Sequence, residues 1–143
     1  ASLDWEGWGI LGGVVWSSDV AVPDEYKQRS TCIPDTAERA ITLAQLVKLE
    51  ALVDEITDKV SLLDPYKDKE RITGEIFNMY NMDAYVVRPL TKPFRCAFVD
   101  LIATGPQPPT WFASHWWGTP FRQTCALLRY HAKRRGLADT VTY

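Results

Sequence analysis

The residue types best suited to chemistry gather in residues 110–121, with the sequence TWFASHWWGTPF. Ser114 and His115 stand next to each other there, and these are two residue types that carry nucleophilic hydrolysis. A serine nucleophile needs a base within hydrogen-bond reach, and the base needs a carboxylate to orient it. Neighbouring side chains on a strand point to opposite faces, and the G-x-S-x-G turn of serine hydrolases is absent. The sequence therefore predicts no catalytic residue in this stretch.

His115 is a better candidate for contact with a ligand. It stands at the end of a predicted strand and beside the start of a predicted helix. Open α/β sheets bind ligands at such places, and helix N-termini attract anions. Gly118 is the only glycine of this turn, however, so there is no glycine-rich phosphate loop. His115, Trp116, Trp117 and Gly118 are thus candidates for ligand or partner contact; the alternative is that His115 bonds to the turn backbone while both tryptophans pack.

A second candidate site is the basic segment 129–135, with the sequence RYHAKRR. Its Arg129, Lys133, Arg134 and Arg135 could dock an acidic partner or phosphates. The same charges also end a predicted helix, where cations offset the helix dipole. No base-stacking aromatic residue other than Tyr130 is interleaved with them, so we expect no specific recognition of nucleic acid.

Six tryptophans are many for 143 residues, because a small core cannot enclose six indole rings and satisfy every N–H. Three of them lie near the N-terminus, at Trp5, Trp8 and Trp16. Residues 1–35 are rich in Gly, Trp and Pro and show no period. The sequence therefore predicts an irregular arm there that docks on a partner surface, with these three tryptophans as contact candidates.

The three cysteines, Cys32, Cys96 and Cys125, are widely spaced and form no C-x-x-C pair. The sequence therefore predicts reduced thiols in a reducing, intracellular compartment. No spacing groups these thiols with His115 or His131 as metal ligands, so we expect neither a metal nor a cofactor. No run approaches the roughly 18 apolar residues of a membrane span, and we expect no transmembrane segment.

The elements that position these residues follow from apolar periodicity. Residues 42–63 form the clearest predicted helix, because Thr42 and Gln45 make a capping box and apolar residues then recur every three or four positions. Asp64 followed by proline predicts a second helix start, and Thr73 predicts a third. The segment RPLTKPF then breaks the helical pattern with two prolines.

The C-terminal third predicts a strand, a turn and a helix. The apolar residues 96–103 are either a strand or a buried helix turn, and residues 110–114 are predicted to form a strand that is covered on both faces. Thr119 is expected to cap the following helix, with proline at its first position, and Gly136 to end it in the left-handed conformation. The last residues, TVTY, look like the start of another strand.

Residues 75–143 resemble an uncharacterised domain of dinoflagellates and other algae, which is marked by an SHWWG or SHAW box. The box here is SHWWG at residues 114–118. In that family a tryptophan-rich strand ending in Asn-Gln follows one helix later. This order is similar to the start of Toll/interleukin-receptor-like and heterokaryon-incompatibility-like domains, which have doubly wound α/β folds. The resemblance implies that this chain holds the opening third of such a fold, without the Asn-Gln end and without the helix that carries the catalytic glutamate in nucleotide-cleaving relatives.

Together these features predict a helix-rich α/β fold. A partial doubly wound strand–turn–helix unit is preceded by amphipathic helices and an irregular N-terminal arm. The predicted parts are a docking arm at 1–35, a helical segment at 36–93 and the strand–turn–helix unit at 94–143, of which 36–143 form one domain. With 46% hydrophobic residues, 143 residues are enough for one domain with a core of its own.

The formal net charge of −2 does not suggest general binding to nucleic acid or anionic membranes. We expect a non-catalytic structural or interaction subunit that docks on the protein subunits of a larger assembly. The start at Ala1 suggests processing, and with the algal resemblance it favours an organellar, photosynthetic setting, peripheral to a membrane complex in a plastid. Two alternatives stay open: a partial nucleotide-binding or NAD-cleaving enzyme or sensor of the Toll/interleukin-receptor type, and a weak nucleic-acid or anion binder through residues 129–135.

Overall fold

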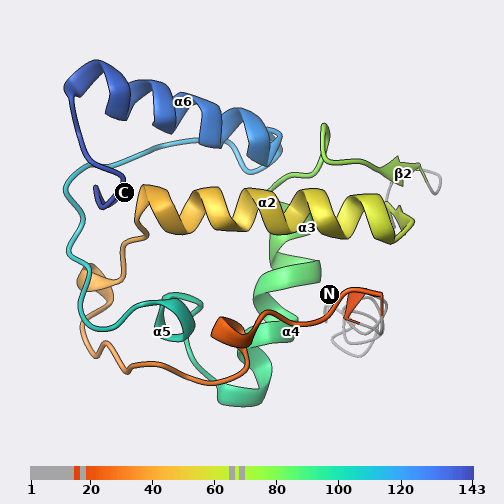
Figure 1. Ribbon diagram of the computed structural model, residues 1–143, viewed down its shortest axis with the longest axis horizontal. Coiled ribbons are helices and arrows are strands. Elements are labelled where there is room, and N and C mark those ends of the chain that lie inside the picture. The colour runs from red at the N-terminus through yellow and green to blue at the C-terminus, as the bar shows by residue number, and fades with distance from the viewer. Residues whose placement is uncertain (1–14, 17–18, 65–66, 68–69) are drawn as a thin grey trace, which may run out of the picture.

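The computed structural model describes residues 15–16, 19–64, 67 and 70–143 of the chain. They form a helix-rich fold in which α2 (Leu43–Lys59) is the central helix and α6 (Phe121–Arg135) lies antiparallel along it (Figure 1). The other elements are η1 (Asp24–Tyr26), η2 (Thr36–Glu38), β1 (Leu62–Leu63), β2 (Arg71–Ile72), α3 (Met79–Met82), the π-helical turn η3 (Asp83–Val87), α4 (Arg88–Thr91), η4 (Lys92–Phe94) and α5 (Val99–Ile102). None of the described helices is both long and apolar enough to cross a membrane.

Helix α2 begins at the capping box that the sequence predicts. The Thr42 hydroxyl oxygen accepts the Gln45 N–H at 3.1 Å, and the Gln45 side chain accepts the Thr42 N–H at 2.9 Å. Its apolar face is buried in the core, through Leu46, Leu49, Leu52, Val53 and Ile56. The helix ends at Lys59, four residues earlier than predicted, because Leu62–Leu63 pair with β2 in an antiparallel hairpin.

The C-terminal residues complete the N-terminal cap of α2. The Leu43 N–H donates to the Val141 carbonyl at 3.0 Å. The Ala44 N–H donates to the Asp139 carbonyl at 2.9 Å, and the neighbouring residues add one antiparallel bridge. The first N–H groups of a helix have no partner within the helix, and here residues 139–143 and the capping box supply the acceptors. The residues TVTY, predicted to start a strand, thus form a single β-bridge to Thr42 and help to cap the N-terminus of α2.

The helical turns from α3 to η4 follow one another without a break, although the prolines of RPLTKPF were predicted to interrupt them. A π-helical turn and a hydrogen bond from a distant side chain make this possible at Pro89. Pro89 has no N–H, so it cannot donate to the Tyr85 carbonyl four residues before it. The indole Nε1 of Trp16 donates to that carbonyl, at 3.1 Å. Trp16, a candidate for partner contact, is therefore half-buried and bonded inside this chain.

Two predicted helix starts are wrong. Asp64 belongs to the hairpin, since its N–H donates to a carbonyl of the returning strand at 2.8 Å, and the proline after it lies outside the described residues. Thr73 opens a single turn, in which its carbonyl accepts two backbone N–H groups. Helix α3 begins later, where Asn78 accepts the N–H groups of Tyr80 and Asn81 and forms a capping box with Asn81.

The described part of residues 1–35 packs into the core of this chain. Val15, Val20 and Tyr26 are buried in the same cluster as the apolar face of α2, and Ile33 is buried against α5. Residues on both sides of position 35 therefore share one core. Trp5 and Trp8 lie outside the described residues, and the docking role of this arm stays a prediction.

Asp100 fixes the path of the N-terminal segment over α5. Its side chain is 1% exposed, and its Oδ1 accepts the Ile33 N–H at 3.0 Å. The other carboxylate oxygen accepts the Ala97 N–H and an Arg29 guanidinium nitrogen, both at 3.3 Å. The Asp100 carbonyl accepts two further N–H groups, from residues 30–31. A buried carboxylate is stable only when it is paired and hydrogen-bonded, so this single residue ties two segments together.

The predicted buried strand at residues 110–114 is wrong. Residues 110–116 form no strand, and Phe112 is 94% exposed. A strand covered on both faces needs a sheet beside it, and the sheet of the described residues is the β1–β2 hairpin at the far end of α2 (Figure 1). A helix-rich fold of mixed α/β type is confirmed. Of the two alternatives left open for residues 96–103, the structure has the buried helix turn, α5. The doubly wound order stays a prediction.

Helix α6 follows the sequence prediction at its end and departs from it at its start. Gly136 has φ 63° and ψ 32°, and the Leu137 N–H donates to the Ala132 carbonyl at 2.9 Å, as in a Schellman cap. At the N-terminus Pro120 occupies the cap position with no side-chain cap bond, so the capping role predicted for Thr119 is wrong.

The first prediction concerns Asp100. Replacing Asp100 by Asn puts an amide donor against backbone N–H groups, and we expect the free energy of unfolding to fall by about 1–3 kcal/mol. Urea denaturation followed by circular dichroism measures the change. The matched control is Asp58→Asn, on the exposed face of α2, which should stay within about 0.5 kcal/mol of the wild type. Equal losses in both variants would contradict the role given to Asp100.

The second prediction concerns the three free thiols. Cys32 is exposed, whereas burial raises the pKa of Cys96 and raises that of Cys125 to about 12. Because the thiolate is the reactive form, Cys32 should react first with a disulfide reagent at pH 8, and Cys125 only on unfolding. Mass spectrometry after timed labelling identifies the modified residue. Labelling of Cys125 in the native protein at the rate of Cys32 would show that this packing is wrong.

Candidate interaction surface

The stretch that contains the SHWWG box is an extended segment that runs antiparallel along α6. We call residues 111–118 the aromatic strap. Trp111 lies at the C-terminal end of α6, beside His131 and Arg135, and Gly118 comes just before the first residues of α6. Residues 111–116 are extended and residues 117–118 form a turn. The strap therefore runs beside α6, from the C-terminal end of the helix back to its N-terminal end (Figure 1).

The start of the strap is held by the C-terminal segment, residues 139–143, that also caps α2. The N–H groups of Thr110 and Trp111 both donate to the Thr142 carbonyl at 3.2 Å. The Trp111 ring lies 4.8 Å from the His131 ring in an edge-on arrangement, and the Arg135 guanidinium lies 5.2 Å from its centroid. A cation placed over an indole face is attracted by the ring, so Arg135 is bound within the chain and is only partly available to a partner.

Trp111 also carries an unsatisfied donor. Its Nε1 is buried and finds no acceptor among the described residues. Leaving such a donor without an acceptor costs about 1–3 kcal/mol. Next to it, His131 Nδ1 lies 2.9 Å from the Tyr143 hydroxyl. The corner between the strap and the end of α6 thus brings together a cation, three rings and a donor without a partner.

The end of the strap is fixed against α3. The Met79 N–H donates to the Trp117 carbonyl at 3.0 Å, and the Thr119 N–H donates to the Trp116 carbonyl at 3.0 Å. The Trp117 ring lies 5.6 Å from the Tyr80 ring at 66°, an edge-on contact. Backbone bonds therefore hold both ends of the strap.

Gly118 is required by the position of Trp116. A Cβ on Gly118 would lie 2.3 Å from Cζ2 of the Trp116 indole, so the ring covers the glycine. His115 is exposed, and its Nδ1 lies 3.3 Å from the Trp116 carbonyl. This contact agrees with the first half of the alternative interpretation, in which His115 bonds to the turn backbone. The second half, in which both tryptophans pack, is not what the structure shows, because both are exposed.

The aromatic side chains of the strap face solvent. Phe112 is 94% exposed, Trp116 72% and Trp117 46%, and Tyr80 is exposed beside them. Phe112 and Tyr80 were not among the candidates from the sequence. For Phe112 the only indication in the sequence was the run of aromatic residues without alternation. For Tyr80 there was no indication, because its contact with Trp117 joins segments that are distant in the sequence.

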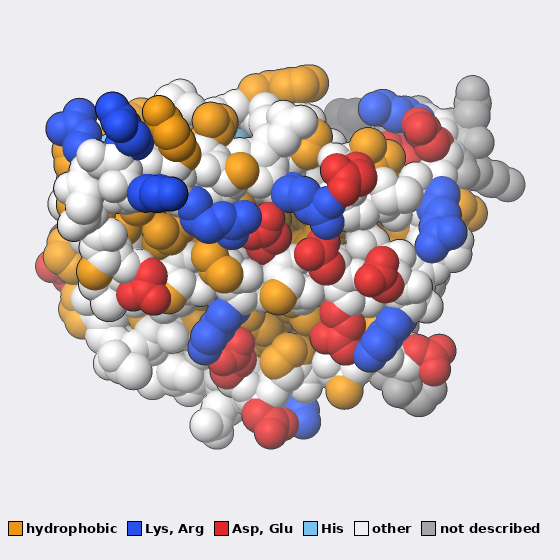
Figure 2. Space-filling view, turned by 45° about the horizontal axis from the view of Figure 1, so that its top comes forward, with side chains coloured by type: hydrophobic (Ala, Val, Ile, Leu, Met, Phe, Trp, Pro, Cys, Tyr) orange, Lys and Arg blue, Asp and Glu red, His pale blue; other side chains and the backbone are white. Residues whose placement is uncertain are grey.

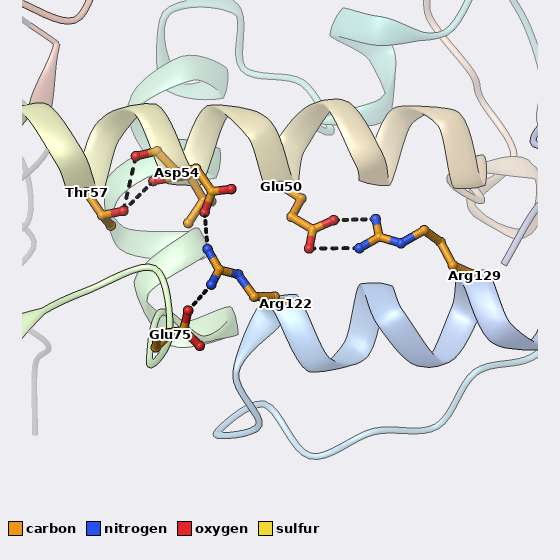
Figure 3. A network of polar contacts seen from close by, with 7 residues as sticks. Glu50, Asp54, Thr57, Glu75, Arg122 and Arg129 are labelled. Atoms are coloured by element: carbon orange, nitrogen blue, oxygen red, sulfur yellow. Dashed lines mark hydrogen bonds and ion pairs between the residues drawn. The ribbon is translucent and has the colours of Figure 1, made fainter.

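Arg129, one of the basic candidates, and Arg122, which the sequence analysis did not single out, both form ion pairs within the chain (Figure 3). Arg129 pairs with Glu50 through both guanidinium nitrogens, one of them at 3.0 Å, and Arg122 pairs with Asp54 at 2.6 Å and with Glu75. These bonds raise the pKa of both arginines. Because the pairs are partly exposed, each contributes at most about 1 kcal/mol, and they mainly set the register of α6 on α2.

The last turn of α6 presents the remaining positive charge. Lys133 and Arg134 are exposed and form no ion pair with any described residue. Figure 2 shows Lys and Arg side chains gathered over this end of the helix, with acidic side chains lower on the same face. Among the described residues no group of His, Cys, Asp or Glu could hold a metal ion. The arrangement suits contact with another molecule.

The third prediction concerns the packing of Trp116 on Gly118. We expect Gly118→Ala to displace the exposed indole with a loss of stability below about 1 kcal/mol, because a surface side chain can swing aside. The indole N–H signal of Trp116 in a ¹H–¹⁵N NMR spectrum, assigned with Trp116→Phe, should shift. Gly105→Ala is the control, since a Cβ there meets nothing within 4 Å. An unmoved Trp116 signal in Gly118→Ala would disprove the contact.

Comparison with known proteins finds no family model that matches the chain, no similar curated protein and no similar solved structure. The resemblance of residues 75–143 to the algal box domain, and what it implies, therefore stays a prediction. The conclusion about this surface depends on its geometry.

Proposed function

We propose that this chain is a non-catalytic interaction subunit, which docks on a larger protein assembly through the aromatic strap and Tyr80. One observation carries the proposal: Phe112, Trp116 and Trp117 are exposed on a segment whose backbone is bonded at both ends. Apolar side chains exposed singly need no explanation, but a run of aromatic rings on one edge is typical of a binding surface.

The energetics of binding favour this surface. Tryptophan and tyrosine dominate the residues that carry protein–protein affinity, because each buries a large area and loses little side-chain entropy. A segment that is already held in its bound shape does not lose backbone freedom on binding. The strap combines exposed aromatic rings with a backbone that is hydrogen-bonded at both ends.

The setting is part of the same proposal. The proposal of an organellar, photosynthetic assembly of protein subunits, peripheral to a membrane complex, depends on the algal resemblance of the SHWWG box. The partial doubly wound unit rests on the same box. The exposed rings support docking in any compartment, so the docking role and the setting are separate parts of this proposal.

The fourth prediction tests the docking role by site-specific cross-linking. A photoreactive phenylalanine analogue replaces Phe112 or Trp116, and Leu63, an exposed apolar residue of β1, is the control position. In an extract of the source cells, both strap positions should cross-link to the same protein and the control position should not. The purified partner should then bind the Phe112→Ala/Trp116→Ala double variant at least about tenfold more weakly than the wild type, as expected for contact residues.

Two results would overturn the proposal. One is equal cross-linking of that protein from Leu63 and from the strap. The other is unchanged affinity of the folded double variant. Both substituted residues are exposed, so thermal unfolding should show that the double variant keeps its fold and that a lost affinity reports lost contacts.

A further inference from the structure

We propose that the outward face of α6 extends the strap surface and binds an acidic amphipathic helix of the partner. The inference rests on the proposed function and names the chemistry of the partner. Leu127 and Tyr130 are 66% and 64% exposed on this face, and Arg134 follows at the exposed end of the same stripe.

All formally charged side chains of α6 are positive. The helix carries five cations and no carboxylate. Arg122 and Arg129 are paired with carboxylates of the neighbouring elements, and Arg135 lies over Trp111. Lys133 and Arg134 are left without a carboxylate among the described residues. A complementary partner therefore carries acidic side chains to this end of the helix.

The spacing on α6 fits a helix. Gln123, Leu127, Tyr130 and Arg134 follow one another at intervals of four, three and four residues, so they form one stripe along the exposed side. Such rows of side chains pack into the grooves of a second helix. The middle of the stripe is apolar and its C-terminal end is positive, which matches an apolar face flanked by Asp or Glu.

The strap borders this stripe and supplies the second side of the site. Trp111 contacts His131 and Arg135. His131 directly follows Tyr130 and comes one turn after Leu127, and Phe112, next to Trp111, is exposed to solvent. This corner carries the positive charge of Arg135, whose guanidinium lies 5.2 Å from the centroid of the Trp111 ring. A partner with carboxylates there pairs with this charge, whereas a purely apolar partner does not.

A protein partner is favoured over nucleic acid by the extent of the charge. The patch consists of the three cations in the last turn of α6, on a chain with a net charge of −2. Sequence-independent binding to a duplex takes several phosphate contacts, and single-strand binders carry a longer basic groove. Apolar side chains also occupy the centre of the stripe, where an acidic helix places its own apolar face.

The test uses a synthetic probe. A fluorescein-labelled 18-residue peptide of Leu and Glu, with Leu at helical spacing, is titrated with the full chain and followed by anisotropy. A scrambled peptide of the same composition and a 20-nucleotide oligo(dT) are the comparison ligands. Variants are Lys133→Glu/Arg134→Glu, the milder Lys133→Gln/Arg134→Gln, and Tyr130→Ala. Arg71→Glu, an exposed cation of β2 at the opposite end of the molecule, is the control (Figure 1).

We expect saturable binding of the amphipathic peptide, at least tenfold tighter than binding of the scrambled peptide or oligo(dT). Charge reversal should weaken it at least tenfold, Gln substitution and Tyr130→Ala about fivefold, and Arg71→Glu less than twofold. Equal affinity for the scrambled peptide, tighter binding of oligo(dT), or unchanged affinity of both charge variants would overturn the inference. If this inference alone fails, the strap positions still cross-link selectively to one protein. If the proposed function fails, Leu63 cross-links to that protein equally or the Phe112→Ala/Trp116→Ala variant binds it with unchanged affinity, whatever the peptide does.

Discussion

The first N–H groups of α2 have no acceptors within the helix, and the way they are satisfied sets much of the surface. Residues 139–143 return from the end of α6 to accept the Leu43 and Ala44 N–H groups. In that position the Thr142 carbonyl also accepts the N–H groups of Thr110 and Trp111. The segment that caps the central helix therefore also holds the start of the strap. The path of the strap thus depends on the residues that supply acceptors to the first N–H groups of α2.

The position of α6 depends on the same arrangement. Its buried face, with Phe121 and Cys125, packs on α2, and the ion pairs of Arg122 and Arg129 fix how far it slides along that helix. Gly136 then turns the chain back toward the start of α2. The strap, α6 and the C-terminal cap are thus connected through shared contacts.

Features that depend on neighbours along the chain could be predicted from the sequence, and features that depend on distant segments could not. The capping box of Thr42 and the glycine stop at Gly136 involve residues within one turn, and both predictions hold. Pro89 was expected to end a helix, and nothing near it shows that Trp16 would donate to the Tyr85 carbonyl. The strand predicted before the box failed for a similar reason, because only the fold shows that no sheet lies beside it.

The exposed aromatic area of the strap is too small to hold a partner tightly without the neighbouring face of α6. Complete burial of one large apolar side chain contributes about 1.5–3 kcal/mol, so the three rings of the strap contribute at most about 5–9 kcal/mol. Association of two proteins costs an estimated 4–15 kcal/mol in lost motion. The strap by itself therefore supports weak or transient contact, and a stable complex needs further area. The stripe of Leu127 and Tyr130 is the adjoining exposed apolar surface, with cations at its end, so the proposed site includes both the strap and α6.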